Sequence, residues 1–230
     1  MKDIRCQIQR NKIVDHLYTT ERHYYSYISI LSNHFIAPLR IKKKQPLSEE
    51  LQKKFFNDVK IVSGITKEFL LSIEEGMKDK ESFDLGVLFL SFGSSFKLIS
   101  QYINDAPLNI NSMKELMKTN PKFKVYLEKT TIEYNNLHKN NQINFFDLYN
   151  LPVSRIQNYH QILQKYESET PNSHKNYESV RLALNLFDEL TEYCKIKSIE
   201  AENLNKMRKV AKEINDMVNQ IKFLFFLTFI

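Results

Sequence analysis

The chain has 230 residues, with 33 Lys and Arg against 27 Asp and Glu, and its formal net charge is +6. This length is enough for one domain with a hydrophobic core, and a hydrophobic content of 42% argues against disorder. With 4 Gly and 6 Pro, the chain lacks the turn glycines that a β-rich or Rossmann-type fold needs. The composition therefore predicts an all-α fold.

The basic charge is spread along the chain, and only Lys42–Lys44 makes a run. A mildly basic surface is compatible with an acidic protein partner, an anionic membrane or nucleic acid, but an ordinary solvated surface also accounts for it. Cys6 and Cys194 show no disulfide or metal spacing. No secretory signal and no run of about 18 apolar residues is present, so we expect a cytoplasmic protein.

Helical patterns follow one another along the chain and are separated by prolines. The predicted helices cover residues 8–36, 48–76, 82–104, 111–118, 121–138, 145–168 and 172–219. Ser48 and Asn120 are expected to be N-caps, and a capping box over Ser112–Glu115 is expected to start a helix after Pro107. At about 1.5 Å per residue the last helix is a rod of roughly 70 Å. The pattern predicts an elongated helical bundle with a long C-terminal helix.

The sequence has no motif for bond-making chemistry. No Gly-rich loop precedes Lys-Ser or Lys-Thr, and the six histidines do not have zinc-ligand spacing. Adjacent carboxylates such as Glu74 and Glu75 point about 100° apart on a helix, so they cannot face one substrate. We therefore expect no catalytic residue, metal or cofactor. A protein that binds and reshapes a partner is favoured over an enzyme.

One carboxylate interrupts an apolar row on the first predicted helix. That row consists of Val14, Tyr18, Glu21, Tyr25 and Ile28, at helical steps of three and four. Taken alone, the pattern favours a glutamate that is solvated or that pairs within the bundle, because most helical glutamates are solvated.

Four segments, in their order along the chain, resemble the Dbl-homology (RhoGEF) domain, and together they cover about residues 8–205. The first has Ile13-Val14, Leu17, Thr20-Glu21, Tyr24 and Pro38-Leu39; the second has Leu47-Ser48, Phe56-Asn57 and Phe69-Leu70; the next has Gly86, Phe89, Phe96, Tyr102, Asn104 and Ala106. In the last, "LPVSRIQNY" is similar to the family's Pro-Val-Gln-Arg-Ile, a basic residue and then Tyr.

This resemblance implies a guanine-nucleotide exchange factor that binds the switch regions of a Rho-family small GTPase, in its nucleotide-free or GDP form, and promotes GDP release. It implies a Dbl-homology helical bundle and a regulatory protein without covalent chemistry. The glutamate of the family's Thr-Glu pair reaches the first switch, so the resemblance assigns this contact to Glu21. It extends the GTPase-binding surface to Ser154, Asn158, Lys195 and Glu202, and it implies that Arg155 holds helices together.

The sequence departs from the family at three of these positions. Ser154 stands where the family usually has Gln, Asn158 where it has a basic residue, and Lys195 where it has Asn. At the last two positions, the amide and the basic side chain of the family are thus exchanged: this chain has Asn at 158 and Lys at 195, on two different helices. If these positions are adjacent in space, the donor charge has moved across the groove. Loss of exchange activity explains the same change, and this alternative is an exchange-inactive scaffold of the same fold that binds a GTPase or another protein.

A third alternative is a basic helical module at an anionic membrane surface. It rests on Lys42–Lys44, on the basic residues between Lys206 and Lys212, and on the apolar end "FLFFLTFI". Nucleic-acid binding has no motif in its favour, so we expect no such partner. Family members usually carry a pleckstrin-homology domain after this domain. Here we expect residues 206–230 to form a helical extension with an apolar tail and no such domain.

Overall fold

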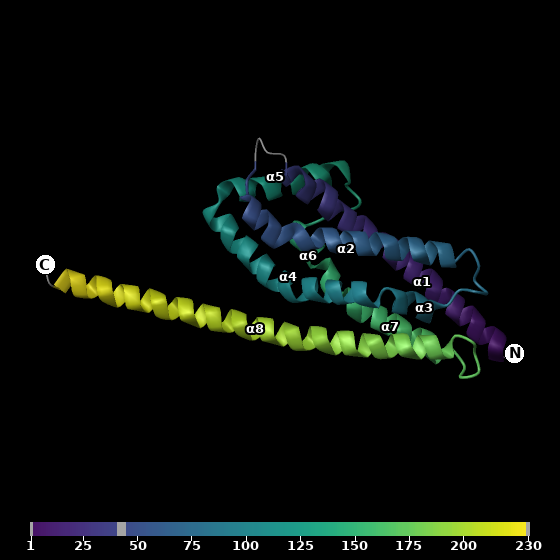
Figure 1. Ribbon diagram of the computed structural model, residues 1–230. Helices are drawn as coiled ribbons and strands as arrows, with labels where there is room; N and C mark the ends of the chain where they lie inside the picture. Colours follow the sequence, from purple (N-terminus) through teal and green to yellow (C-terminus); the bar gives the residue numbers. More distant parts are fainter. Residues whose placement is uncertain (1, 41–44, 229–230) are drawn as a thin grey trace.

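The computed structural model describes residues 2–40 and 45–228, and all regular elements among them are helical (Figure 1). The long helices are α1 (Lys2–Ile30), α2 (Glu49–Gly76), α4 (Gly93–Thr119), α5 (Pro121–Leu137), α7 (Arg155–Ser168) and α8 (Tyr177–Thr228). Shorter elements are a π-helical turn (Leu31–Ile36), two 3-10 turns (Ala37–Arg40 and Leu151–Ser154), α3 (Leu85–Ser91) and α6 (Phe145–Asn150). The predicted all-α fold with a long C-terminal helix is confirmed. The Lys42–Lys44 run lies outside the described residues.

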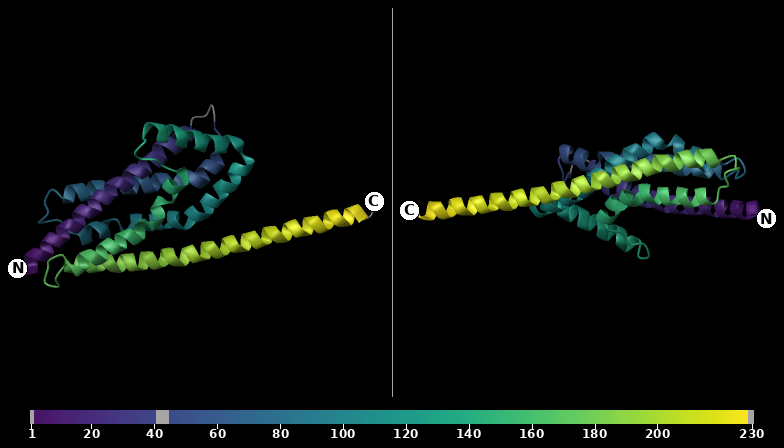
Figure 2. Two further views of the ribbon diagram at one scale, coloured as in Figure 1. Left: turned by 180° about the vertical axis from the view of Figure 1, so that it is seen from behind. Right: turned by 90° about the horizontal axis from the view of Figure 1, so that it is seen from below.

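The bundle is elongated, and α8 runs along one side of it (Figure 1). The first part of α8 packs on α3, α4 and α7, while α1 packs on α2 and α7. Figure 2 shows from two further sides that the C-terminal half of α8 extends beyond the other helices. At about 1.5 Å per residue, the 52 residues of α8 span roughly 78 Å.

An aromatic cluster joins five helices at the centre of the bundle. Its members are Phe69 of α2, Phe89 of α3, Phe96 of α4, Tyr159 of α7 and Phe187 of α8, all almost completely buried. Phe96 lies 5.2 Å from Phe69 and from Tyr159, and 5.1 Å from Phe187, between ring centroids. Most of these contacts are edge-to-face, the geometry that aromatic rings prefer. The cluster fixes α7 against α8, which carry most of the predicted site.

Local signals placed several helix ends correctly. The Ser48 hydroxyl accepts a hydrogen bond from the backbone N–H of Leu51 and so caps α2. Asn120 caps α5 by accepting from the backbone N–H of Phe123, with Pro121 in the first turn.

The predicted break around Pro107 is wrong. Pro107 lies inside α4, which continues to Thr119, so Ser112–Glu115 lies within a helix and does not form a capping box. Buried side chains on both sides of the proline, Ala106 and Met113, hold one continuous helix against the core. Packing of this kind outweighs the hydrogen bond that a proline removes.

Other predicted helices also differ from the structure. The helix predicted over 82–104 is divided at Phe92 into α3 and the first part of α4. The pattern over 145–168 is interrupted by the 3-10 turn at Leu151–Ser154, where Pro152 lies in the first turn. The last helix begins at Tyr177 rather than at residue 172, and it continues to Thr228 rather than to residue 219. Helix ends depend on long-range packing as well as on local signals, so such shifts are expected.

Candidate partner-binding surface

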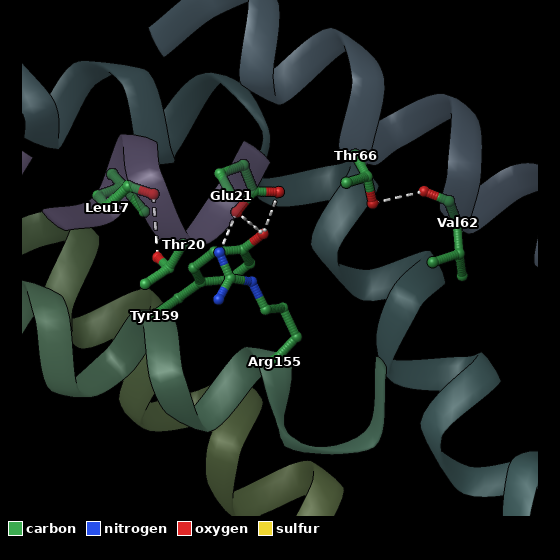
Figure 3. Close-up of polar contacts among 7 residues, drawn as sticks. All are labelled: Leu17, Thr20, Glu21, Val62, Thr66, Arg155 and Tyr159. Carbon is green, nitrogen blue, oxygen red and sulfur yellow. Dashed lines mark hydrogen bonds and ion pairs between the residues drawn. The ribbon is translucent and has the colours of Figure 1, made fainter. Parts of the chain in front are cut away.

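Glu21 of α1 is completely buried and bonded to two residues of α7 (Figure 3). Its carboxylate forms an ion pair with the guanidinium of Arg155. The hydroxyl of Tyr159 lies 3.0 Å from one carboxylate oxygen and 2.9 Å from the other, as a donor. Arg155 and Tyr159 are four residues apart, so they lie on the same face of α7. These contacts tie the middle of α1 to the beginning of α7.

Aromatic rings surround the charge of Arg155. The guanidinium carbon lies 4.5 Å from the ring centroid of Tyr159 and 4.9 Å from that of Tyr24. Arg155 is only 5% exposed, so these cation–π contacts act where water is largely excluded. The predicted role of Arg155, to hold helices together, agrees with these contacts.

Burial dominates the electrostatics of this pair. It raises the pKa of Glu21 above the ordinary value, although Arg155 and the Tyr159 hydroxyl both act to lower it. Burial also acts to lower the pKa of Arg155, but Tyr159 and Glu21 outweigh it and hold that pKa above the ordinary value. Arg155 therefore stays charged, and it is the counter-ion that makes a buried carboxylate tolerable here.

The structure separates the interpretations of Glu21. A solvated side chain is excluded, because Glu21 has no exposed surface. Pairing within the bundle is what the structure shows, since Arg155 and Tyr159 occupy the carboxylate. A direct contact between Glu21 and a partner stays a prediction. Such a contact requires that the Glu21 carboxylate either separate from Arg155 or bind Arg155 and the partner at the same time.

The other four predicted residues lie at the surface. Ser154 and Asn158 are exposed at the beginning of α7, and Lys195 and Glu202 are exposed on α8. The ammonium of Lys195 lies 3.8 Å from a carboxylate oxygen of Glu192. Glu202 forms an ion pair of 2.9 Å with Lys206, one turn further along α8. All four side chains are accessible to a partner.

A cleft of about 460 Å³ separates the exposed edges of α7 and α8. Residues that line it include Ile156, Gln157 and His160 of α7 and Thr191, Cys194 and Lys195 of α8. Asn158 is not among them, whereas its neighbour Gln157 lines the cleft together with Lys195. The postulated exchange of roles between Asn158 and Lys195 therefore stays a prediction.

The sequence interpretation did not include two residues of this cleft region. His160 of α7 lies 2.7 Å from a carboxylate oxygen of Asp188 of α8, between Nε2 and Oδ1. Gln157 lies one turn before His160 on the same side of α7. Their spacing marks one helix face, but nothing in the sequence shows which helix packs against that face.

The part of the chain that the structure describes has neither a cluster of metal-binding side chains nor a helix that could cross a membrane. Residues 2–40 and 45–228 contain no group of three or more His, Cys, Asp or Glu side chains placed to hold a metal ion. In the same residues, no helix combines the length and the apolar character needed to cross a bilayer.

Comparison with known proteins identifies a family. The family model described as the RhoGEF domain matches residues 13–195. The "Kinase and exchange factor for Rac B" of Dictyostelium discoideum is 27% identical over 213 residues, which are 90% of this chain and 19% of that protein. The human "Guanine nucleotide exchange factor VAV3" is 23% identical over 206 residues, which are 90% of this chain and 23% of that protein. The chain thus spans about a fifth of the length of these relatives.

Solved structures show the same fold. The DH/PH domains of p115-RhoGEF match with a TM-score of 0.76 and 16% identity, over 90% of this chain and 60% of that one. The DH/PH domains of PDZ-RhoGEF, solved in complex with activated RhoA, match with a TM-score of 0.75 and 14% identity, over 88% of this chain and 57% of that one. The helical architecture is therefore that of a Dbl-homology domain.

Proposed function

Because the chain belongs to the RhoGEF domain family, we propose that it is a guanine-nucleotide exchange factor for a Rho-family small GTPase. The family match over residues 13–195 carries this proposal, because it includes α7 and the part of α8 that reaches Lys195. In support, two relatives in Dictyostelium discoideum are named as exchange factors for Rac. The proposed action is to bind the switch regions of the GTPase and to promote the release of GDP.

The proposed binding surface consists of Ser154, Asn158, Lys195 and Glu202 around the edges of α7 and α8. These residues supply hydroxyl, amide, ammonium and carboxylate groups, and all of them are exposed. Exposed groups of these kinds can form charge-assisted hydrogen bonds with a partner. The cleft between α7 and α8 adds apolar area from the half-buried side chain of Val153.

Glu21 has a conditional role in this proposal. Removing one partner of a buried ion pair costs about 3–5 kcal/mol, so Glu21 leaves Arg155 only when other donors replace the guanidinium. The backbone N–H and hydroxyl groups of a switch segment are donors of this kind. The binding of Glu21 to the GTPase is thus proposed to occur together with partial release of Arg155.

The mechanism needs no acid, base or nucleophile on this chain. A protein that binds the nucleotide-free GTPase more tightly than the loaded form must weaken nucleotide binding by the same factor. If nucleotide release is accelerated about a thousandfold, the contacts must stabilise the transition state for release by roughly 4 kcal/mol. A few charge-assisted hydrogen bonds and a packed apolar patch can supply this amount.

The test is the release of a fluorescent GDP analogue from a panel of Rho-family GTPases. We expect faster GDP release from one or more of them. Asn158→Ala and Lys195→Ala should each lower this acceleration at least about tenfold, since a charge-assisted hydrogen bond contributes about 1.5–3 kcal/mol. Both side chains are exposed, so folding is not at risk. Lys129→Ala is the matched control, because Lys129 is an equally exposed lysine on α5, away from α7 and α8 (Figure 1).

The outcomes separate the two family interpretations. If no GTPase responds although the protein is folded and retains a nucleotide-free GTPase on a column, the chain is an exchange-inactive scaffold. In that case, the departures from the family at Asn158 and Lys195 would be explained by loss of exchange activity. If neither release nor retention is detected for any member of the panel, the proposal of a Rho-family partner is wrong.

A further inference from the structure

The C-terminal part of α8 leaves the bundle. Among the side chains of α8 whose burial the structure describes, Ala201 is the last buried one, with 9% exposure. From residue 202 to residue 222 all side chains are exposed except that of Asn205, which is half-buried. In Figures 1 and 2 the C-terminal end of α8 extends past the other helices in each view. Its helical conformation therefore receives little support from packing on the bundle.

Large apolar side chains form a continuous stripe along this exposed segment. The stripe, called the α8 stripe below, consists of Met207, Val210, Ile214, Met217, Val218 and Ile221, which are 40–69% exposed. Their steps of mostly three and four residues place them on one face of the helix. Contiguous apolar surface of this kind on a soluble domain marks a binding surface.

The opposite face of the same segment is basic. Residues 203–222 contain five basic side chains, Lys206, Arg208, Lys209, Lys212 and Lys222, and two acidic ones, Glu213 and Asp216, which leaves a net charge of +3. None of these residues belongs to the α8 stripe. At about 100° per residue, Lys206 and Lys222 lie beside the two edges of the stripe, where long side chains can reach toward anionic groups.

The breadth of the stripe argues against a two-stranded pairing of α8 with a second copy. A two-stranded coiled coil buries positions a and d and usually has charged residues at e and g. With Met207 at a and Val210 at d, the e positions are Ala211 and Val218, which are both apolar and exposed. Such a dimer would leave part of the stripe in water. The apolar layer of a lipid bilayer is flat and can cover the whole stripe.

We infer that residues 204–222 of α8 form an amphipathic helix that binds the surface of an anionic lipid bilayer. The α8 stripe enters the boundary between headgroups and acyl chains, and the basic side chains lie among the anionic headgroups. Lys195 and Glu202 lie roughly 90–110° around the helix from the centre of the α8 stripe, at about 100° per residue. A membrane-bound α8 therefore leaves the proposed GTPase-binding surface open, and this inference does not depend on the proposed function.

The test is cosedimentation of the whole chain with phosphatidylcholine vesicles, prepared with and without phosphatidylserine. We expect binding to the vesicles that contain phosphatidylserine, weaker binding at high salt, and little binding to phosphatidylcholine alone. The triple substitution Met207→Ser, Ile214→Ser and Ile221→Ser should lower the affinity at least about tenfold, because it removes buried apolar area without changing charge.

A matched control uses exposed apolar residues outside α8. Val125→Ser with Ile132→Ser changes two side chains of α5 that are 57% and 58% exposed, and it should leave vesicle binding unchanged. Far-UV circular dichroism checks that all variants fold. Absence of binding to the anionic vesicles would overturn the inference. So would a wild-type dimer in sedimentation velocity that the stripe substitutions convert to a monomer while vesicle binding stays the same.

Discussion

The buried pair of Glu21 and Arg155 joins α1 to α7 through two residues that are 134 positions apart along the chain. An ion pair in such a place costs desolvation of both charges, so its net contribution to stability is small, but loss of one partner is expensive. The rings of Tyr24 and Tyr159 on Arg155 limit the room for water to replace a missing partner. The pair therefore fixes the position of α1 on α7 more than it adds to stability.

We expect Arg155→Met to lower the free energy of unfolding by about 3–5 kcal/mol, because it leaves the Glu21 carboxylate buried without a counter-ion. The double variant Glu21→Leu with Arg155→Met should recover most of this loss, since two apolar side chains can replace a buried pair. Urea unfolding followed by circular dichroism measures both. Equal losses in the single and double variants would show that the charge of Glu21 is not the cause.

Asp79 makes stability depend on pH at the turn after α2. The Ser82 hydroxyl, the Ser82 backbone N–H and the Glu81 backbone N–H donate to its carboxylate and hold its pKa below the ordinary value. A lowered pKa in the folded state stabilises the fold above the pKa of the unfolded chain. This contribution is lost as the pH falls through the folded pKa.

We therefore expect Asp79→Ala to be less stable than the wild type at neutral pH, with a difference that shrinks as the pH falls below the ordinary range of aspartate. The comparison of Asp79→Asn with Asp79→Ala is the control, because neither side chain titrates and their difference should not change over this range. Thermal unfolding at a series of pH values measures all three proteins. If the wild type became more stable relative to Asp79→Ala as the pH fell, the lowered pKa of Asp79 would be contradicted.

At the scale of elements, one glycine sets how closely α3 approaches α8. A Cβ atom on Gly86 would lie 2.3 Å from the carbonyl carbon of Ser179 and 2.4 Å from the nitrogen of Val180. Both are backbone atoms of α8, so no side-chain rotation can relieve the clash. Only glycine permits this approach, which brings Phe89 and Phe187 to 5.3 Å between ring centroids.

We expect Gly86→Ala to lower the free energy of unfolding by about 1–3 kcal/mol, the usual cost of overpacking. Gly64→Ala is the matched control, because a Cβ atom on this exposed residue of α2 meets no other atom within 4 Å. It should raise stability by roughly 0.5–1 kcal/mol, since alanine favours a helix interior. Urea unfolding of both variants measures whether each substitution lowers or raises the free energy of unfolding. A Gly86→Ala variant as stable as the wild type would exclude the close approach.

The sequence predicted those elements whose signals are local. Composition indicated the all-α class, and side-chain caps at Ser48 and Asn120 placed two helix starts, because each cap needs only its own first turn. Pro107 gave a wrong break, because the contacts that keep α4 continuous come from distant residues. Similarly, the apolar row around Glu21 left open a solvated side chain or a pairing within the bundle, and its partner Arg155 follows from tertiary packing.

The whole molecule combines a packed bundle with a projecting helix. The core ends where Ala201 is buried, and the helix continues for about 27 residues to Thr228. The family match ends at residue 195, shortly before this point. Two functions are therefore proposed for two successive parts of α8, with exchange on the part up to Glu202 and lipid binding on residues 204–222.

A chain shortened to end at Asn205 tests this division. We expect its melting temperature to stay within a few degrees of the wild type, because residues 206–222 are all exposed and contribute little burial. The ion pair of Glu202 with Lys206 is lost, but exposed pairs contribute at most about 1 kcal/mol. Nucleotide release from the responsive GTPase should be retained in solution, and binding to anionic vesicles should be lost. A large fall in melting temperature would show instead that the projecting part of α8 stabilises the bundle, and that its exposed apolar face is not reserved for a lipid surface.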